Sequence, residues 1–140
     1  MGRVIRTENL ATERNRLMKA MSLALREMGK KTAYDEESQD LAAFLVLALD
    51  AVSESIERSV APWEKRDYWL KADRFRTDWA WVDTLGAKLR AAIIAQRPDE
   101  IALAAAVLAD KLKDVKVSAR HRLGSPWRGA WKQLTTGVIS

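Results

Sequence analysis

Carboxylates are the residues whose types and spacing come nearest to a reactive site in this chain. Two short stretches, "EESQD" and "EKRD", hold the acids Glu36, Glu37, Asp40, Glu64 and Asp67. Carboxylates three or four residues apart lie on one face of a helix, and two such faces can bind Mg²⁺ between them. Metal-dependent hydrolysis is therefore the first chemistry that these residues suggest.

The two stretches resemble the EExxE and ExxD motifs of the all-α nucleotide pyrophosphohydrolases, which hold magnesium between the motifs. The apolar spacing between them, however, predicts one long helix from residue 36 to about residue 60. Because a helix rises about 1.5 Å per residue, the two acidic groups would lie about 35 to 40 Å apart. A second acidic group has no acidic partner expected on another helix: Asp50, Glu54 and Glu57. We therefore expect no metal site and no cofactor, and a metal-dependent nucleotide hydrolase is the least favoured of three functions.

Histidine and cysteine chemistry is limited by the composition. The chain has one histidine, His121, and no cysteine. A single histidine excludes paired-histidine metal sites, and the absence of cysteine excludes disulfides, thiolate ligands and a cysteine nucleophile. Arg120 and Arg122 flank His121, which favours a solvated loop position over a catalytic base. No catalytic residue is predicted.

The C-terminal segment carries a candidate anion site. Its basic residues surround a helix start predicted at Ser125 and Pro126. They are Arg120, His121, Arg122, Arg128 and Lys132. Free backbone N–H groups at a helix N-terminus, together with arginine, suit phosphate. We predict an anion or nucleic-acid contact here, with a solvated basic tail as the alternative.

Aromatic residues are concentrated in residues 63–81, "WEKRDYWLKADRFRTDWAW", which contain four of the six tryptophans. At about 100° per residue, one helical face is predicted to point to the core. It holds Tyr68, Ala72, Phe75, Trp79, Val82, Gly86, Leu89 and Ile93. A second stripe, which packs on a neighbouring helix or on a second subunit, holds Trp63, Leu70, Trp81 and Leu85.

Trp69 belongs to neither stripe and falls among charged residues. A tryptophan beside arginine either lies flat across the surface or under the C-terminal segment, with the guanidinium stacked on it, or contacts a partner. The second interpretation predicts a partner-binding group of Trp63, Lys65, Arg66, Trp69, Arg76 and Trp81. Two surface ion pairs four residues apart are expected on the same helix: Asp67 with Lys71, and Arg74 with Asp78.

Hydrophobic spacing is helical in every long segment, which predicts an all-α fold. The expected helices cover about 7–28, 35–60, 62–95 and 98–115, with a short helix after Ser125. Pro62 is expected to separate the second helix from the third, because a proline inside a helix removes a hydrogen bond. Short connections favour an antiparallel four-helix bundle in a single domain, 1–140, with the C-terminal segment 115–136 folded onto it as a clasp.

Charge is divided unevenly along the chain, whose net charge is +5. Residues 1–34 hold eight Lys or Arg against three acids, residues 35–109 nine against fourteen, and residues 110–140 seven against two. The basic ends either dock on the acidic middle or bind phosphate or an acidic partner. No apolar stretch suits a membrane span or a signal peptide, so we expect a cytoplasmic protein without membrane contact.

The segments "WEKRDYWLKADRFRTDWAW" and "VKVSARHRLGSPW" together are similar to a family of small bacterial helical proteins of unknown function. The resemblance covers about the second half of the chain and implies no activity, cofactor or site residue. It implies that the two segments belong together, so that the clasp folds over the helix of residues 62–95.

Surplus aromatic surface without catalytic residues favours a non-enzymatic helical-bundle module. Such an interaction or accessory subunit would assemble with itself or with a protein partner. The alternative, which follows from the basic ends, is a small subunit that binds nucleic-acid backbone in a ribonucleoprotein-type complex, by fold-level analogy.

Overall fold

The computed structural model describes residues 7–139, and their longest apolar segment forms the helix α2 (Glu36–Lys65). Asp35 caps its N-terminus, because its carboxylate accepts hydrogen bonds from the backbone N–H and the hydroxyl of Ser38, each at 2.9 Å. Apolar residues lie on most of its circumference. The buried ones are Leu41, Ala42, Ala43, Leu45, Val46, Ala48, Leu49, Val52, Ile56 and Val60. A helix with so wide an apolar surface must be covered from several sides.

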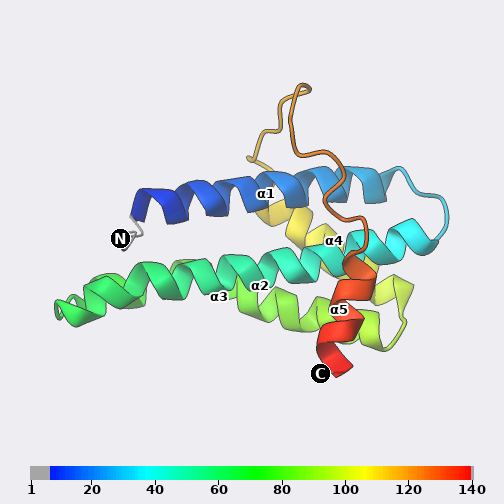
Figure 1. Ribbon diagram of the computed structural model, residues 1–140. Helices are drawn as coiled ribbons and strands as arrows, with labels where there is room; N and C mark the ends of the chain where they lie inside the picture. Colours follow the sequence, from blue (N-terminus) through cyan, green and yellow to red (C-terminus); the bar gives the residue numbers. More distant parts are fainter. Residues whose placement is uncertain (1–6, 140) are drawn as a thin grey trace.

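Three helices cover α2 and a fourth completes the fold. α1 (Thr7–Gly29), α3 (Trp69–Ile94) and α5 (Ala130–Ile139) contact α2, whereas α4 (Pro98–Lys111) contacts α3 and α1. In Figure 1, α1, α2 and α3 run back and forth beside one another, and α5 lies across the end where α2 begins. The all-α prediction is confirmed, since the described residues form helices, turns and no strand, with contacts compatible with a bundle.

Most of the predicted core positions are buried. Ala72, Val82, Leu89 and Ile93 of α3 are almost fully covered. The prediction for Tyr68 is wrong, because this side chain is 53% exposed. It lies just before α3, where the tip formed by the end of α2 and the start of α3 projects past the first described turn of α1 (Figure 1).

The expected break at Pro62 is also wrong, because α2 continues through Pro62 to Lys65. The chain turns instead at Asp67, which has a positive φ of 62°. Tyr68 N–H donates to Trp63 C=O at 2.8 Å and Asp67 N–H to Glu64 C=O at 3.1 Å, the two bonds of a Schellman motif. Helices that end in this way usually have glycine at this position. Because aspartate occupies it here, the sequence does not indicate that α2 ends at this point.

The C-terminal helix begins later than predicted, and it packs on a different helix from the one expected. α5 begins at Ala130, after turns at residues 126–129, and it packs on α2, not over the helix expected at 62–95. The carboxylate of Asp40 in α2 accepts the backbone N–H groups of Gly129 at 3.2 Å and Trp131 at 2.9 Å. An acid on α2 therefore supplies the N-terminal hydrogen bonds that Ser125 was expected to supply.

Pro62→Ala tests the continuity of α2. The alanine N–H can donate to Arg58 C=O, so we expect the free energy of unfolding to rise by about 1 to 2 kcal/mol, after the greater freedom of the unfolded chain is subtracted. Urea denaturation followed by far-UV circular dichroism measures the change. Pro126→Ala, outside the helices, is the control and should lower stability slightly; a loss of stability in Pro62→Ala would contradict a continuous α2.

Candidate functional site

Four aromatic rings from α2 and α3 form a continuous row, which consists of Trp63, Phe75, Trp79 and Trp81. Successive ring centroids lie 5.3, 6.3 and 6.1 Å apart. These separations lie within the range in which aromatic rings attract one another. The row joins the side chain of Trp63 in α2 to those of α3. Four of the aromatic side chains in residues 63–81 therefore pack as one cluster.

Cations lie against every ring of this row. Lys71 Nζ is 4.4 Å from the Trp63 centroid, and Lys111 Nζ of α4 is 5.8 Å from that of Trp81. The guanidinium carbon of Arg14 in α1 lies 5.2 Å from Phe75 and 5.4 Å from Trp79. Cations within about 6 Å of a ring face are attracted to it. The row is therefore held by α1 and α4 as well as by its own rings.

Arg14 is the buried charge at the centre of this arrangement. It is 6% exposed, and it donates from Nε to Ser55 Oγ at 3.0 Å and from Nη2 to Ser59 Oγ at 2.8 Å. Among the described residues no carboxylate forms an ion pair with it, and burial lowers the pKa of Arg14, opposed by Glu13. Sequence reasoning missed this residue, although Leu10, Arg14, Leu17 and Met21 share one helical spacing.

Arg76, a predicted partner-binding residue, forms ion pairs with two glutamates of its own chain. Its guanidinium donates to both carboxylate oxygens of Glu57, each at 3.0 Å, and to those of Glu64 at 2.6 and 3.1 Å. The hydrogen bonds to Glu64 and then to Glu57 raise the pKa of Arg76, and the same bond to Arg76 lowers the pKa of Glu64. Arg76 thus fastens the start of α3 to the end of α2.

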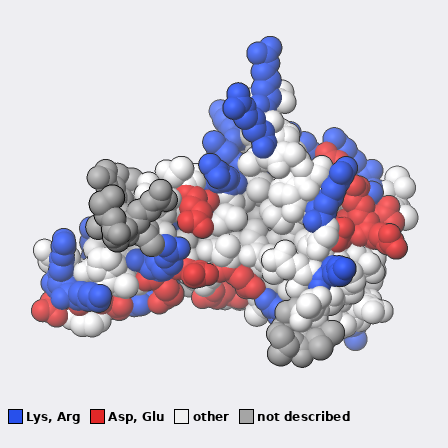
Figure 2. Space-filling model, in the orientation of Figure 1, with Lys and Arg blue, Asp and Glu red and all other residues white. Residues whose placement is uncertain are grey.

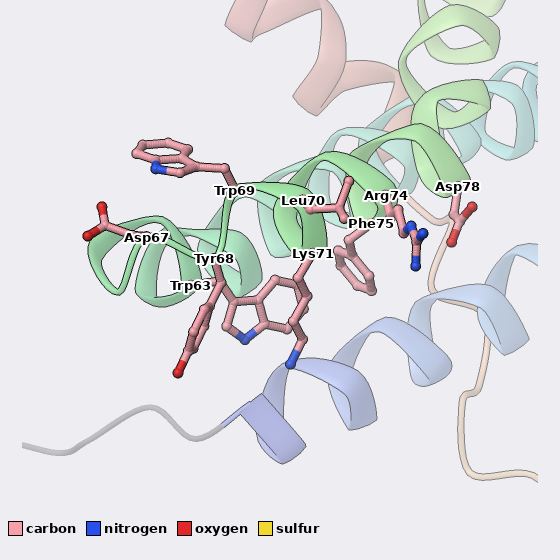
Figure 3. A pocket seen from close by; sticks show the side chains of 9 residues that line it. All are labelled: Trp63, Asp67, Tyr68, Trp69, Leu70, Lys71, Arg74, Phe75 and Asp78. Carbon is pink, nitrogen blue, oxygen red and sulfur yellow. The ribbon is translucent and has the colours of Figure 1, made fainter.

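An open hollow of about 720 Å³ lies at the projecting tip of the α2–α3 pair. We call it the tip hollow; its lining includes Trp63, Asp67, Tyr68, Trp69, Leu70, Lys71, Arg74, Phe75 and Asp78 (Figure 3). Tyr68, Trp69 and Leu70 are 53%, 54% and 67% exposed. In Figure 3, Trp69 projects away from Tyr68 and Trp63, so the aromatic surface extends over two sides of the tip.

Charges of both signs surround the tip hollow. The expected ion pairs of Asp67 with Lys71 and of Arg74 with Asp78 are absent from the described residues, and Lys71 lies over Trp63 instead. Asp67, Arg74 and Asp78 are exposed. The rim therefore combines exposed aromatic surface with acids and bases that face solvent.

The predicted partner-binding group is divided between four places, of which the ion pairs of Arg76 are one. Trp63 and Trp69 line the tip hollow. Lys65 and Arg66 are exposed at the end of α2. Trp81 is half-buried, stacked on Trp79, outside the hollow. Sequence reasoning did not include Tyr68, which it assigned to the core, or Leu70, which it assigned to a stripe that packs on a neighbouring helix or on a second subunit. Both side chains are exposed where the tip projects past α1 (Figure 1).

The predicted anion group is partly brought together. His121 and Arg122 line a second hollow, of about 420 Å³, between α1 and the segment that connects α4 to α5. We call it the basic hollow. Arg120, Arg128 and Lys132 are exposed but do not line it. Arg16 and Lys19 of α1 do, although sequence reasoning did not assign them; the basic excess of residues 1–34 was the signal for them.

Acidic residues of the hydrolase-like motifs have structural contacts. Asp40 accepts the N–H groups at the start of α5, and Glu64 binds Arg76. Because α2 is unbroken, its 30 residues separate Glu36 from Glu64 by about 40 Å. Among the residues that the structure describes, no three His, Asp or Glu side chains come together as metal ligands would.

Comparisons with known proteins give no family or activity for this chain. No protein-family model matches it, and neither a curated protein nor a solved structure shows significant similarity. In the part of the chain that the structure describes, no helix has the length and apolar character to cross a membrane. Function is therefore inferred from the geometry of the two hollows.

Arg14→Ala tests the buried cation. We expect the free energy of unfolding to fall by about 2 to 3 kcal/mol, because the variant loses two hydrogen bonds to a charged group and the stacked packing on Phe75 and Trp79. Urea denaturation measures the change. Arg16→Ala, on the exposed side of α1, should change stability by less than about 0.5 kcal/mol. Equal effects of the two substitutions would contradict a structural role for Arg14.

Glu64→Gln tests the attachment of α3 to α2 through Arg76. The folded-state pKa of Glu64 is lowered from its ordinary 4.5, so its contribution is present above that pH and is lost as the pH falls through the lowered pKa. The melting temperature of the variant should therefore be below that of the wild type at pH 7, and the two should converge at acidic pH. Thermal melts at several pH values measure this; Glu54→Gln should show no convergence, and a pH-independent difference for Glu64→Gln would contradict the ion pair.

Proposed function

We propose that this protein is a non-enzymatic interaction module, an antiparallel four-helix bundle of α1–α4 with α5 folded onto it, which self-associates through the tip hollow. The observation that carries the proposal is the run Tyr68, Trp69 and Leu70, three consecutive large side chains that are each more than half exposed. Contiguous exposed apolar surface with a polar rim is typical of a protein interface.

The chemistry of the tip favours a protein surface as its ligand. Tryptophan and tyrosine are enriched among the residues that dominate binding energy, because they bury a large area with few rotatable bonds. Covering half of such a side chain contributes about 1 kcal/mol or more. A second exposed apolar area, with Leu103 and Val107 of α4, lacks aromatic residues. The tip is therefore the stronger candidate of the two.

The tip is also held in place before it meets a partner. The Schellman motif closes α2, Arg76 joins the end of α2 to α3, and Trp63 packs edge-on against Phe75. Preorganisation of this kind lowers the entropy lost on binding. Association would then require little rearrangement of the backbone.

Charge complementarity points to a second copy of the chain as the occupant. The rim carries Asp67 and Asp78 together with Lys71 and Arg74, two charges of each sign. In a two-fold interface the same patch meets itself, so it must supply both signs to pair across the axis. A strongly acidic or basic partner would leave half of these charges opposed to like charges.

Leu70→Ala and Trp69→Ala test the self-association. We expect the wild type to form dimers in sedimentation equilibrium, and each substitution to raise the dimer dissociation constant at least tenfold, because each removes apolar contact at the centre of the interface. Leu103→Ala is the matched control, since Leu103 is 69% exposed and Leu70 67%. Its dissociation constant should stay within about twofold of the wild type.

Three results would contradict the proposal. The first is a wild type that remains monomeric at all attainable concentrations. The second is a dimer that Leu103→Ala disrupts and Leu70→Ala does not, which would place the interface on α4. The third is a monomer that binds another protein through Trp69, which would replace the second copy by a different partner.

A further inference from the structure

The basic hollow lies apart from the tip and joins two segments that are distant in sequence. Arg16 and Lys19 come from α1, while His121 and Arg122 come from residues 112–129, which connect α4 to α5. In Figure 1 this connection projects over α1, and Figure 2 shows Lys and Arg side chains gathered on the projection. No acidic side chain is among the described residues that line the hollow.

Folding has placed like charges together here. The basic ends of the chain could have docked on its acidic middle, and Lys31 does pair with Asp35 and Glu37. Within the described residues, however, neither Arg16 and Lys19 nor Arg122 forms an ion pair. Repulsion between these cations destabilises the folded state. A ligand that carries negative charge would remove this repulsion.

The polar groups of the hollow suit phosphate. Two guanidinium groups and an ammonium group can donate to phosphate oxygens, and Asn15 adds an amide. His121 Nδ1 accepts the N–H of Leu123 at 3.3 Å, which leaves the proton of the neutral ring on Nε2 as a further donor. No Phe, Tyr or Trp is among the described residues that line the hollow.

The basic surface continues beyond the hollow. Lys116 and Arg120 are exposed on the same connection, and neither lines the hollow of about 420 Å³. A single phosphate would reach only the cations within the hollow, whereas a chain of phosphates reaches those on the projection as well. Contacts of Arg and Lys with phosphate oxygens position a protein on nucleic acid and carry no sequence information.

We infer that the basic hollow and the projection beside it bind the phosphodiester backbone of nucleic acid, in a manner independent of base sequence. This site is separate from the tip hollow, and its ligand is of a different class. The two proposals can therefore fail independently.

Fluorescence anisotropy with two labelled DNA duplexes of unrelated sequence tests the inference. We expect both to bind with similar affinity at 50 mM salt, and affinity to fall about 40-fold or more at 200 mM, as about three or more phosphate contacts require. Arg16→Ala combined with Lys19→Ala should reduce the slope of log affinity against log salt by about 2. Leu103→Ala, which is on α4 and outside both hollows, should bind as the wild type does.

A charge-matched control separates local contacts from net charge. Arg58→Ala combined with Lys88→Ala removes two exposed cations from α2 and α3, outside the basic hollow. It should leave the salt slope unchanged, and circular dichroism confirms that all variants are folded. The inference is overturned if neither duplex binds at low salt, or if the control loses as much affinity as the Arg16 and Lys19 variant. Binding only to inorganic phosphate, or only to vesicles with anionic lipid, would overturn it too.

Discussion

α2 presents apolar side chains around most of its circumference, and the fold is arranged to cover them. α1, α3 and α5 each lie against it, and the carboxylate of Asp40 on α2 holds the N-terminus of α5. The cover does not extend over its whole length, because α2 has 30 residues and α1 has 23. The last turns of α2 and the first turn of α3 project together as a tip (Figure 1). Tyr68 and Trp69 are exposed there.

Polar interactions stabilise the tip, which α1 does not cover. Arg76 binds two carboxylates of α2, and Asp67 adopts the left-handed conformation that closes α2. Behind the tip, Arg14 of α1 fills the space between two α3 rings and two α2 hydroxyls. A buried cation with no carboxylate partner is costly unless donors and ring faces satisfy it, and here both do. The same aromatic row thus supports the core at one end and forms the proposed interface at the other.

The sequence predicted the helical fold and most of the α3 core face, and it placed Trp69 outside the packed stripes, because these follow from the spacing of apolar residues. It did not predict where α2 ends, since Pro62 is tolerated in the last turns and Asp67 occupies a position usually taken by glycine. It assigned Tyr68 to the core because helical spacing gives orientation but not the length of the neighbouring helix. Arg76 was expected to face a partner, and its binding to Glu57 and Glu64 depends on two helices coming together. Arg16 and Lys19 lie near Arg122 in the basic hollow, and this too depends on tertiary structure.

Hydrogen–deuterium exchange at two protein concentrations measures whether a second copy of the chain buries the tip. Backbone amides of residues 66–73 should exchange more slowly in the concentrated sample than in the dilute one, while those of α4 should exchange at the same rate in both. Concentration-independent exchange throughout, or slowing confined to residues 98–111, would contradict the account.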